Sequence, residues 1–206
     1  MKQNLFIALE GIDGSGKSSQ AKLLAERLEQ AGHKVHCTLE PTEGYIGSIL
    51  LNILRGKVKA DPRVIATLFA ADRLEHLLNE ETGIIKKLKD GYTVITDRYY
   101  FSSYAYNGAY SDLDWVIDIN KMSARLLRAD INIFIDVPPD VCMQRINTNR
   151  GTTELFEKLD TLITVRAKYL EAFDKLKNEE NIAIVNGNRS VVAIADEIWA
   201  KVSASD

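Results

Sequence analysis

Short apolar runs alternate with longer amphipathic stretches along the whole chain of 206 residues. Each run is rich in β-branched residues and has the length of a buried strand in a parallel sheet. Between the runs, apolar residues recur at helical spacing. The predicted strands are Leu5–Leu9, Lys34–Leu39, Tyr92–Thr96, Ile131–Val137 and Ile182–Val185. The predicted helices, with breaks allowed in the long ones, are Lys17–Ala31, Tyr45–Leu54, Pro62–Leu88, Leu113–Leu127, Pro139–Asn147, Glu154–Lys177 and Val191–Val202.

This alternation predicts an α/β fold, a parallel five-stranded sheet with helices on both faces. The chain is 46% hydrophobic and contains no linker, internal repeat or low-complexity tract. We therefore expect a single domain over residues 1–206. Ligands of such sheets bind beyond the carboxyl ends of the strands, so the residues that follow the strands are the first candidates for chemistry.

The first predicted strand leads into a glycine-rich segment, residues 11–18, that matches the phosphate-loop pattern G-x-x-x-x-G-K-[ST] in full. Its glycines allow positive φ angles and let backbone N–H groups turn toward a phosphate. Lys17, on a loop that we expect to face solvent, adds charge for the β- and γ-phosphates, and the Ser18 hydroxyl is a ligand for Mg²⁺. A connecting turn is the alternative, but it has no need of Lys-Ser at a helix start. The residues predicted to bind a nucleoside triphosphate here are Gly11, Ile12, Asp13, Gly14, Ser15, Gly16, Lys17, Ser18 and Ser19.

A carboxylate, Asp97, ends the apolar strand that begins at Tyr92. A P-loop enzyme places the acid that holds Mg²⁺ at such a position. Asp136 ends a strand in the same way, and a strand-terminal Asp is often only a helix cap. Arg98 favours Asp97, because its guanidinium lies next to the metal and can clamp a second anionic group. The polar and aromatic residues that follow, 99–107, suit a base and a sugar.

Two further segments carry candidate ligand contacts. Phe69 and Arg73 are four apart in a helical pattern, so together they could stack on a nucleobase and bond to its edge. An ordinary amphipathic helix, with Phe69 in the core and Arg73 solvated, is the alternative. Residues 145–154 are polar and basic, which predicts a short mobile lid that closes over phosphates and carries Arg145 and Arg150. A solvated loop with incidental arginines is the alternative there.

The net charge of the chain argues against one class of binding partner. The formal net charge is -3 and the isoelectric point about 5.7, so the chain lacks the basic field that binds a nucleic acid polymer. The first residues form neither a signal peptide nor a membrane span, so we expect a cytoplasmic protein with no membrane partner.

The chain resembles the thymidylate kinases, the dTMP kinases of the nucleoside monophosphate kinase group, over nearly its whole length. The resemblance rests on Glu10-Gly-x-Asp13 before Gly-Lys-Ser, joined to Asp97-Arg98-Tyr99. Further matching pieces are Glu40-Pro41, Leu68-Phe69-Ala70-Ala71-Asp72-Arg73, Ser102-Ser103-x-Ala105-Tyr106 and Glu154-Leu155-Phe156-Glu157.

The resemblance implies a P-loop kinase that transfers a phosphoryl group from Mg·ATP to dTMP and works as a homodimer. It implies that Asp13 reaches the sugar 3′-hydroxyl and that Tyr106 crowds the sugar C2′. Phe69 stacks on thymine in this reading, and Arg73 bonds its edge. The full implied acceptor site is Asp13, Phe69, Arg73, Arg98, Ser102, Ser103, Tyr106 and Asn107.

The resemblance also assigns the charged groups of the reaction. Arg98 grips the acceptor phosphate, Asp97 acts on Mg²⁺ together with Ser18, and Arg145 lies near adenine. In the family, the transition-state arginine sits either in the phosphate loop or in the lid. Because Gly14 and Ser15 fill the loop positions, Arg150 is the candidate.

Three positions depart from the family pattern. Leu39 replaces a frequent arginine before Glu40-Pro41, Asn107 replaces a longer glutamine, and Leu155 replaces an arginine beyond the lid. The expected reaction, phosphorylation of dTMP to dTDP, has three rivals. They are a sibling kinase for another monophosphate or a deoxynucleoside, a regulatory GTPase, for which no Asn-Lys-x-Asp is present, and a nucleotide-binding scaffold without turnover.

Overall fold

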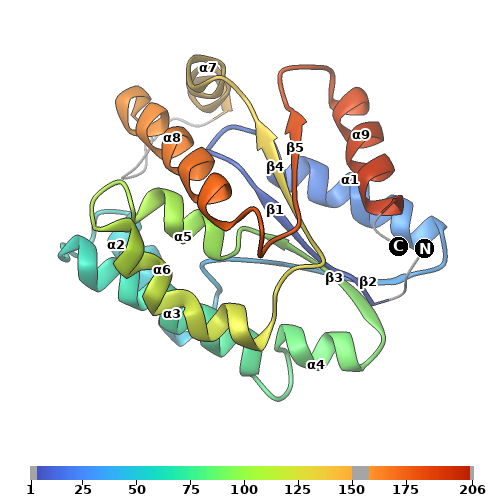
Figure 1. Ribbon diagram of the computed structural model, residues 1–206, viewed down its shortest axis with the longest axis horizontal. Coiled ribbons are helices and arrows are strands. Elements are labelled where there is room, and N and C mark those ends of the chain that lie inside the picture. The colour runs from blue at the N-terminus through green and yellow to red at the C-terminus, as the bar shows by residue number, and fades with distance from the viewer. Residues whose placement is uncertain (1–3, 150–157, 205–206) are drawn as a thin grey trace.

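A computed structural model describes residues 4–149 and 158–204 of the chain. Its centre is a sheet of five parallel strands in the order β2-β3-β1-β4-β5, with helices on both faces (Figure 1). The predicted α/β fold class is therefore confirmed. The strands are β1 (Phe6–Glu10), β2 (Lys34–Leu39), β3 (Tyr92–Asp97), β4 (Ile131–Asp136) and β5 (Ile182–Asn186).

More helices cover one face of the sheet than the other (Figure 1). On one face α1 packs beside α9, and on the other α5 packs beside α8, with α3 and α6 farther out. No helix of the described residues is long and apolar enough to cross a bilayer. The helices are α1 (Lys17–Gln30), α2 (Tyr45–Leu54), α3 (Pro62–Leu78), α4 (Ile84–Lys89), α5 (Tyr100–Tyr106), α6 (Leu113–Leu126), α7 (Pro139–Asn149), α8 (Leu159–Leu176) and α9 (Val191–Ser203).

The helical boundaries differ from the prediction in three places. The stretch 62–88 is two helices, because the Asn79 side chain accepts hydrogen bonds from the backbone of Glu81 and Thr82 and turns the chain. Residues 100–106, part of the polar and aromatic segment expected to suit a base and a sugar, form the wholly buried helix α5. Residues 145–149, placed in the lid, continue α7. The rest of the predicted lid, 150–154 with Arg150, lies outside the described residues, as does Leu155.

The core lies on both sides of β1, whose residues are all buried. On the α8 side, the ring of Phe134 in β4 packs against Tyr169 and Phe173, with ring centroids 4.9 and 5.1 Å apart. Burying each such side chain contributes roughly 1.5–3 kcal/mol, so this layer fixes α8 against the sheet. The floor of the site is therefore closely packed.

The strand register brings the candidate loops together. Leu9 of β1 pairs with Asp97 of β3, and Leu39 of β2 pairs with Asp97 from the other side. The backbone N–H of Glu40 donates to the Asp97 carbonyl at 3.1 Å. The carboxyl ends of β1, β2 and β3 thus bring three loops to one edge of the sheet, where ligands of parallel sheets bind.

Candidate functional site

The phosphate loop has the backbone that its glycines predict. The φ angles of Gly11, Gly14 and Gly16 are 151°, 80° and 95°, which confirms the positive φ angles. A Cβ on Gly14 would lie 2.6 Å from the carbonyl oxygen of Cys142, so only glycine fits where α7 approaches the loop. Helix α7 therefore packs directly against the phosphate loop at Gly14.

Lys17 lies under this loop. Its Nζ donates to the carbonyl oxygens of Gly11 and Ile12, at 3.0 and 3.1 Å, and the side chain is buried. The loop wraps around the ammonium group, so Lys17 is buried although its neighbours Gly16 and Ser18 are exposed. Burial lowers the pKa of Lys17, and the nearby charge of Arg98 lowers it further.

Ser18 and Asp97 come together as the sequence predicts for a metal pair. The Ser18 hydroxyl donates to Asp97 Oδ2 at 2.6 Å, while Asp97 Oδ1 is buried with no hydrogen-bond partner in the described part of the chain. Such an oxygen set fits Mg²⁺, which prefers one or two carboxylates together with waters and phosphates. The other strand-terminal carboxylate, Asp136, accepts from Nε and Nη2 of Arg166, at 2.7 and 2.8 Å. Asp136 therefore anchors α8.

Arg98 has a strained backbone conformation, and its side chain lines the site. Its φ is 76°, a left-handed value that costs a non-glycine residue about 1–3 kcal/mol and that clusters at functional sites. Its guanidinium pairs with the Asp13 carboxylate and donates to the Ser102 hydroxyl at 3.1 Å. It also lies 4.8 Å from the centre of the Tyr106 ring, whose hydroxyl donates to Asp13 at 2.9 Å.

Glu10, which the sequence analysis used only as part of a motif, organises the floor below Arg98. Its buried carboxylate accepts from the Tyr99 N–H at 2.8 Å, the Ser102 hydroxyl at 2.6 Å and the Tyr169 hydroxyl at 2.9 Å. Burial raises the pKa of Glu10. Glu10 therefore ties β1 to α5 and α8. Tyr169 offered no sequence signal beyond its place in an amphipathic helix.

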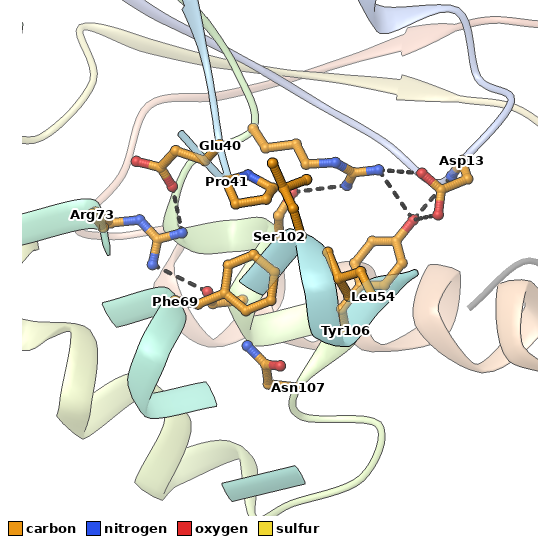
Figure 2. A pocket seen from close by; sticks show the side chains of 12 residues that line it. Asp13, Glu40, Pro41, Leu54, Phe69, Arg73, Ser102, Tyr106 and Asn107 are labelled. Carbon is orange, nitrogen blue, oxygen red and sulfur yellow. Dashed lines mark hydrogen bonds and ion pairs between the residues drawn. The ribbon is translucent and has the colours of Figure 1, made fainter. Parts of the chain in front are cut away.

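A pocket opens beside Arg98 between α2, α3 and α5 (Figure 2). Every residue that the resemblance implied for the acceptor lines it, and the structure adds Glu40, Pro41, Leu51 and Leu54. Phe69 faces the cavity from α3, and Asn107 lies below it (Figure 2). Asn107 is buried, and its Nδ2 has no partner among the described residues.

Arg73 is only 1% exposed, so the solvated reading of this residue was wrong. Its Nη2 pairs with Glu40 at 2.6 Å and donates to the Tyr99 carbonyl at 3.2 Å. Its Nη1 donates to Ser103 at 3.1 Å and to Asn120. Only Nε lacks a partner among the residues that the structure describes.

A second, larger groove runs over the phosphate loop. Asp13 to Ser19 line it, while Gly11 and Ile12 lie below and hold Lys17. Arg145 reaches it from α7 and donates to the carbonyl oxygens of Gly14 and Gly187, at 3.4 and 3.2 Å. The structure adds side chains near the end of β5 that sequence patterns did not mark, namely Arg189, Val191 and Ile194.

The groove and the pocket are neighbours that share part of their lining. Asp13, Glu40, Pro41 and Arg98 line both. A group bound in the pocket therefore meets a group bound on the phosphate loop at Asp13 and Arg98.

Comparison with known proteins gives one consistent result. The family model for thymidylate kinase matches residues 9–198. The chain is 40% identical over 204 residues to a probable thymidylate kinase of Pyrococcus horikoshii, covering 96% of this chain and 95% of that protein. Probable thymidylate kinases of Thermococcus onnurineus and Methanocaldococcus jannaschii are 38% and 37% identical, each over 96% of this chain, with 97% and 95% of their own lengths covered. On this similarity, the chain belongs to the thymidylate kinase family.

Proposed function

We propose that this protein phosphorylates dTMP to dTDP with Mg·ATP by direct in-line transfer. The observation that carries the proposal is the shared wall of the two cavities, where a phosphate loop faces a buried pocket across Arg98 and Asp13. Phosphoryl transfer needs two anions aligned and their charge neutralised, and this geometry supplies both. The acceptor phosphate is itself a nucleophile at neutral pH, so no covalent intermediate on the protein is needed.

Arg98 is the residue that we propose holds the acceptor phosphate. In the structure its guanidinium is already oriented by Asp13, Ser102 and the Tyr106 ring. A phosphate that enters the pocket competes with Asp13 for this guanidinium. Asp13 then accepts a hydrogen bond from the sugar 3′-hydroxyl, while Tyr106 fills the space at C2′.

The donor side holds the triphosphate through the phosphate loop. We propose that Lys17 neutralises charge between the β- and γ-phosphates and that Ser18 and Asp97 hold Mg²⁺, with Arg145 near adenine. The ion, when bound, neutralises charge on the β- and γ-phosphate oxygens. The phosphate loop contains no arginine, and we propose that Arg150 stabilises the charge of the transferring phosphoryl group.

The base selectivity follows from two unused donors. Arg73 Nε and Asn107 Nδ2 are buried and unpartnered within the described residues. Thymine offers carbonyl oxygens to such donors, whereas cytosine presents an amino group at C4. A buried donor left unpaired costs about 1–3 kcal/mol, so the pocket favours a pyrimidine with two carbonyls.

The proposal is tested by measuring ADP formation from ATP with a panel of nucleoside monophosphates and deoxynucleosides. We expect the highest kcat/KM with dTMP. A higher value with another monophosphate or with a deoxynucleoside supports the sibling-kinase alternative. ADP formation that no acceptor stimulates contradicts transfer and supports a switch or a scaffold.

We also propose a homodimer that acts in the cytoplasm, where ATP and nucleoside monophosphates are found. Helices α3 and α6 pack side by side and expose apolar side chains, which an interface between copies would cover. Light scattering of the purified protein tests the oligomer, and a monomeric mass contradicts it. The exposed residues are Val64, Leu78, Met122 and Leu126.

A further inference from the structure

One face of α3 holds the segment that leads from β2 into the site. The Asp72 carboxylate accepts from the backbone N–H and the hydroxyl of Thr42, at 2.8 and 2.6 Å. Four residues farther along the helix, the ring of His76 lies 2.7 Å from the Thr38 hydroxyl through Nε2 and 3.1 Å from Glu40 Oε1 through Nδ1. His76 is 8% exposed, so these contacts are shielded from water.

The chemistry of the partners assigns the direction of these hydrogen bonds. An ionised carboxylate only accepts, so His76 Nδ1 carries the proton and donates to Glu40. The other ring nitrogen of a neutral imidazole then accepts from the Thr38 hydroxyl. Glu40 therefore has one oxygen on His76 and the other on Arg73, at 3.1 and 2.6 Å.

Glu40 in turn fixes the guanidinium of Arg73 (Figure 2). The contacts with Tyr99, Ser103, Asn120 and Glu40 occupy both terminal nitrogens of Arg73. Glu40 is the charged member of this set, and it reaches the guanidinium from a loop rather than from a helix. If Glu40 loses its bond to His76, it is free to rotate away, and the guanidinium loses its ionic partner. The position of Arg73 in the lining of the pocket would then no longer be fixed.

We propose that His76 is a positioning residue for acceptor recognition, acting through Glu40 on Arg73. It rests on the proposed function, because it assigns His76 to the selectivity of the same pocket. His76 touches neither pocket, since it lines neither the acceptor cavity nor the groove over the phosphate loop. We expect His76 to affect recognition of the acceptor base and not binding of the donor nucleotide.

The test compares three variants with a matched control. His76→Leu removes the donor to Glu40, and Glu40→Gln removes the charge that holds Arg73. His76→Asn keeps an amide donor near the position of Nδ1. The control is His33→Leu, because His33 also contacts a strand threonine, Thr93, through Nδ1 at 3.3 Å, but lies away from both cavities.

We expect His76→Leu and Glu40→Gln to raise the KM for dTMP about tenfold, the effect of one lost hydrogen bond in a buried site, and to narrow the preference for dTMP over dCMP. The KM for ATP should stay within about twofold. His76→Asn should recover most of the selectivity, and His33→Leu should leave it unchanged.

The outcome separates the two proposals. If the native protein does not phosphorylate dTMP, the proposed function fails. If it does, and His76→Leu retains the dTMP over dCMP preference of His33→Leu at equal folded fraction, the positioning role of His76 is overturned. If His76→Leu does not fold, the other two variants decide. A dTMP preference kept in Glu40→Gln overturns the positioning role of His76. A preference lost in Glu40→Gln but kept in His76→Asn supports that role.

Discussion

The acceptor pocket and the groove over the phosphate loop are built from different parts of the chain. The pocket is lined by side chains that bind one another, as Arg73 does with Glu40 and Arg98 with Asp13. The groove is lined to a large extent by the loop backbone, with Lys17 held below it by two carbonyl groups. We propose that the pocket distinguishes bases and that the groove holds phosphates.

The difference follows from what each group can recognise. Backbone N–H groups at a helix start bind any phosphate, since a phosphate looks the same in every nucleotide. Side chains with fixed donors reject a ligand that leaves them unpaired. Strict selection of the acceptor and weaker selection of the donor base are therefore expected.

The largest predicted effect falls on the donor side. Arg150→Ala should lower kcat by about 10³–10⁵, the range for an arginine that stabilises a transferring phosphoryl group, with little change in dTMP affinity. Arg145→Ala should instead raise the KM for ATP. Initial rates of both variants give kcat and KM and so test the two assignments. A large fall in kcat for Arg145→Ala, with kcat unchanged in Arg150→Ala, would reverse the roles of the two arginines.

Lys17→Ala should lower kcat by at least about 10²–10³, the cost of removing one group aimed at transition-state charge. Because Nζ also holds Gly11 and Ile12, we expect some loss of thermal stability but a folded protein by circular dichroism. The control is Lys22→Ala on the exposed side of α1. Unchanged kinetics in a folded Lys17→Ala protein contradicts the phosphate-loop assignment.

Replacing dTMP by dUMP should lower kcat/KM by only about 10–200-fold, since the two acceptors differ by one methyl group in an apolar part of the pocket. Competition between the two acceptors in one reaction measures this ratio directly. A ratio near one would mean that no side chain contacts the methyl group, and Phe69 and Leu54 would then not face it.

The smallest effect concerns stability. The pKa of Glu10 is raised above 4.5 in the folded protein by burial, so its contribution to stability is full below about pH 4.5 and falls as pH rises through the higher folded pKa. Urea unfolding measures the free energy of unfolding of the native protein and of Glu10→Gln. The value for the native protein should fall relative to the value for the variant as pH rises. If the free energy of unfolding of the native protein instead rises relative to that of Glu10→Gln over this pH range, the raised pKa of Glu10 is contradicted.

The sheet could be predicted from the sequence because each strand is a short apolar run and its order with the helices allows few topologies. Helix α5 was missed because Tyr100–Tyr106 mixes serines with aromatic residues and is buried on every side, so it shows no amphipathic stripe. The break after Leu78 depends on one asparagine side chain, which no periodicity reveals.

The phosphate loop could be predicted because its residues are adjacent in sequence, and so could Asp97-Arg98. The roles of Glu10 and His76 could not, because their partners lie 92 and 36 residues away, at Ser102 and Glu40. A buried carboxylate leaves no periodic signal, and its partners are known only once the helices are packed.

We propose that the acceptor side selects by base and that the donor side selects by phosphate. This proposal is tested most directly by one set of initial rates of ADP or GDP formation, with dTMP and dCMP as acceptors and ATP and GTP as donors. We expect dCMP to lower kcat/KM on the order of 10⁴-fold relative to dTMP, because buried donors are left unpaired, and GTP to lower it far less relative to ATP. Equal rates with dTMP and dCMP, or a donor preference larger than the acceptor preference, would contradict it.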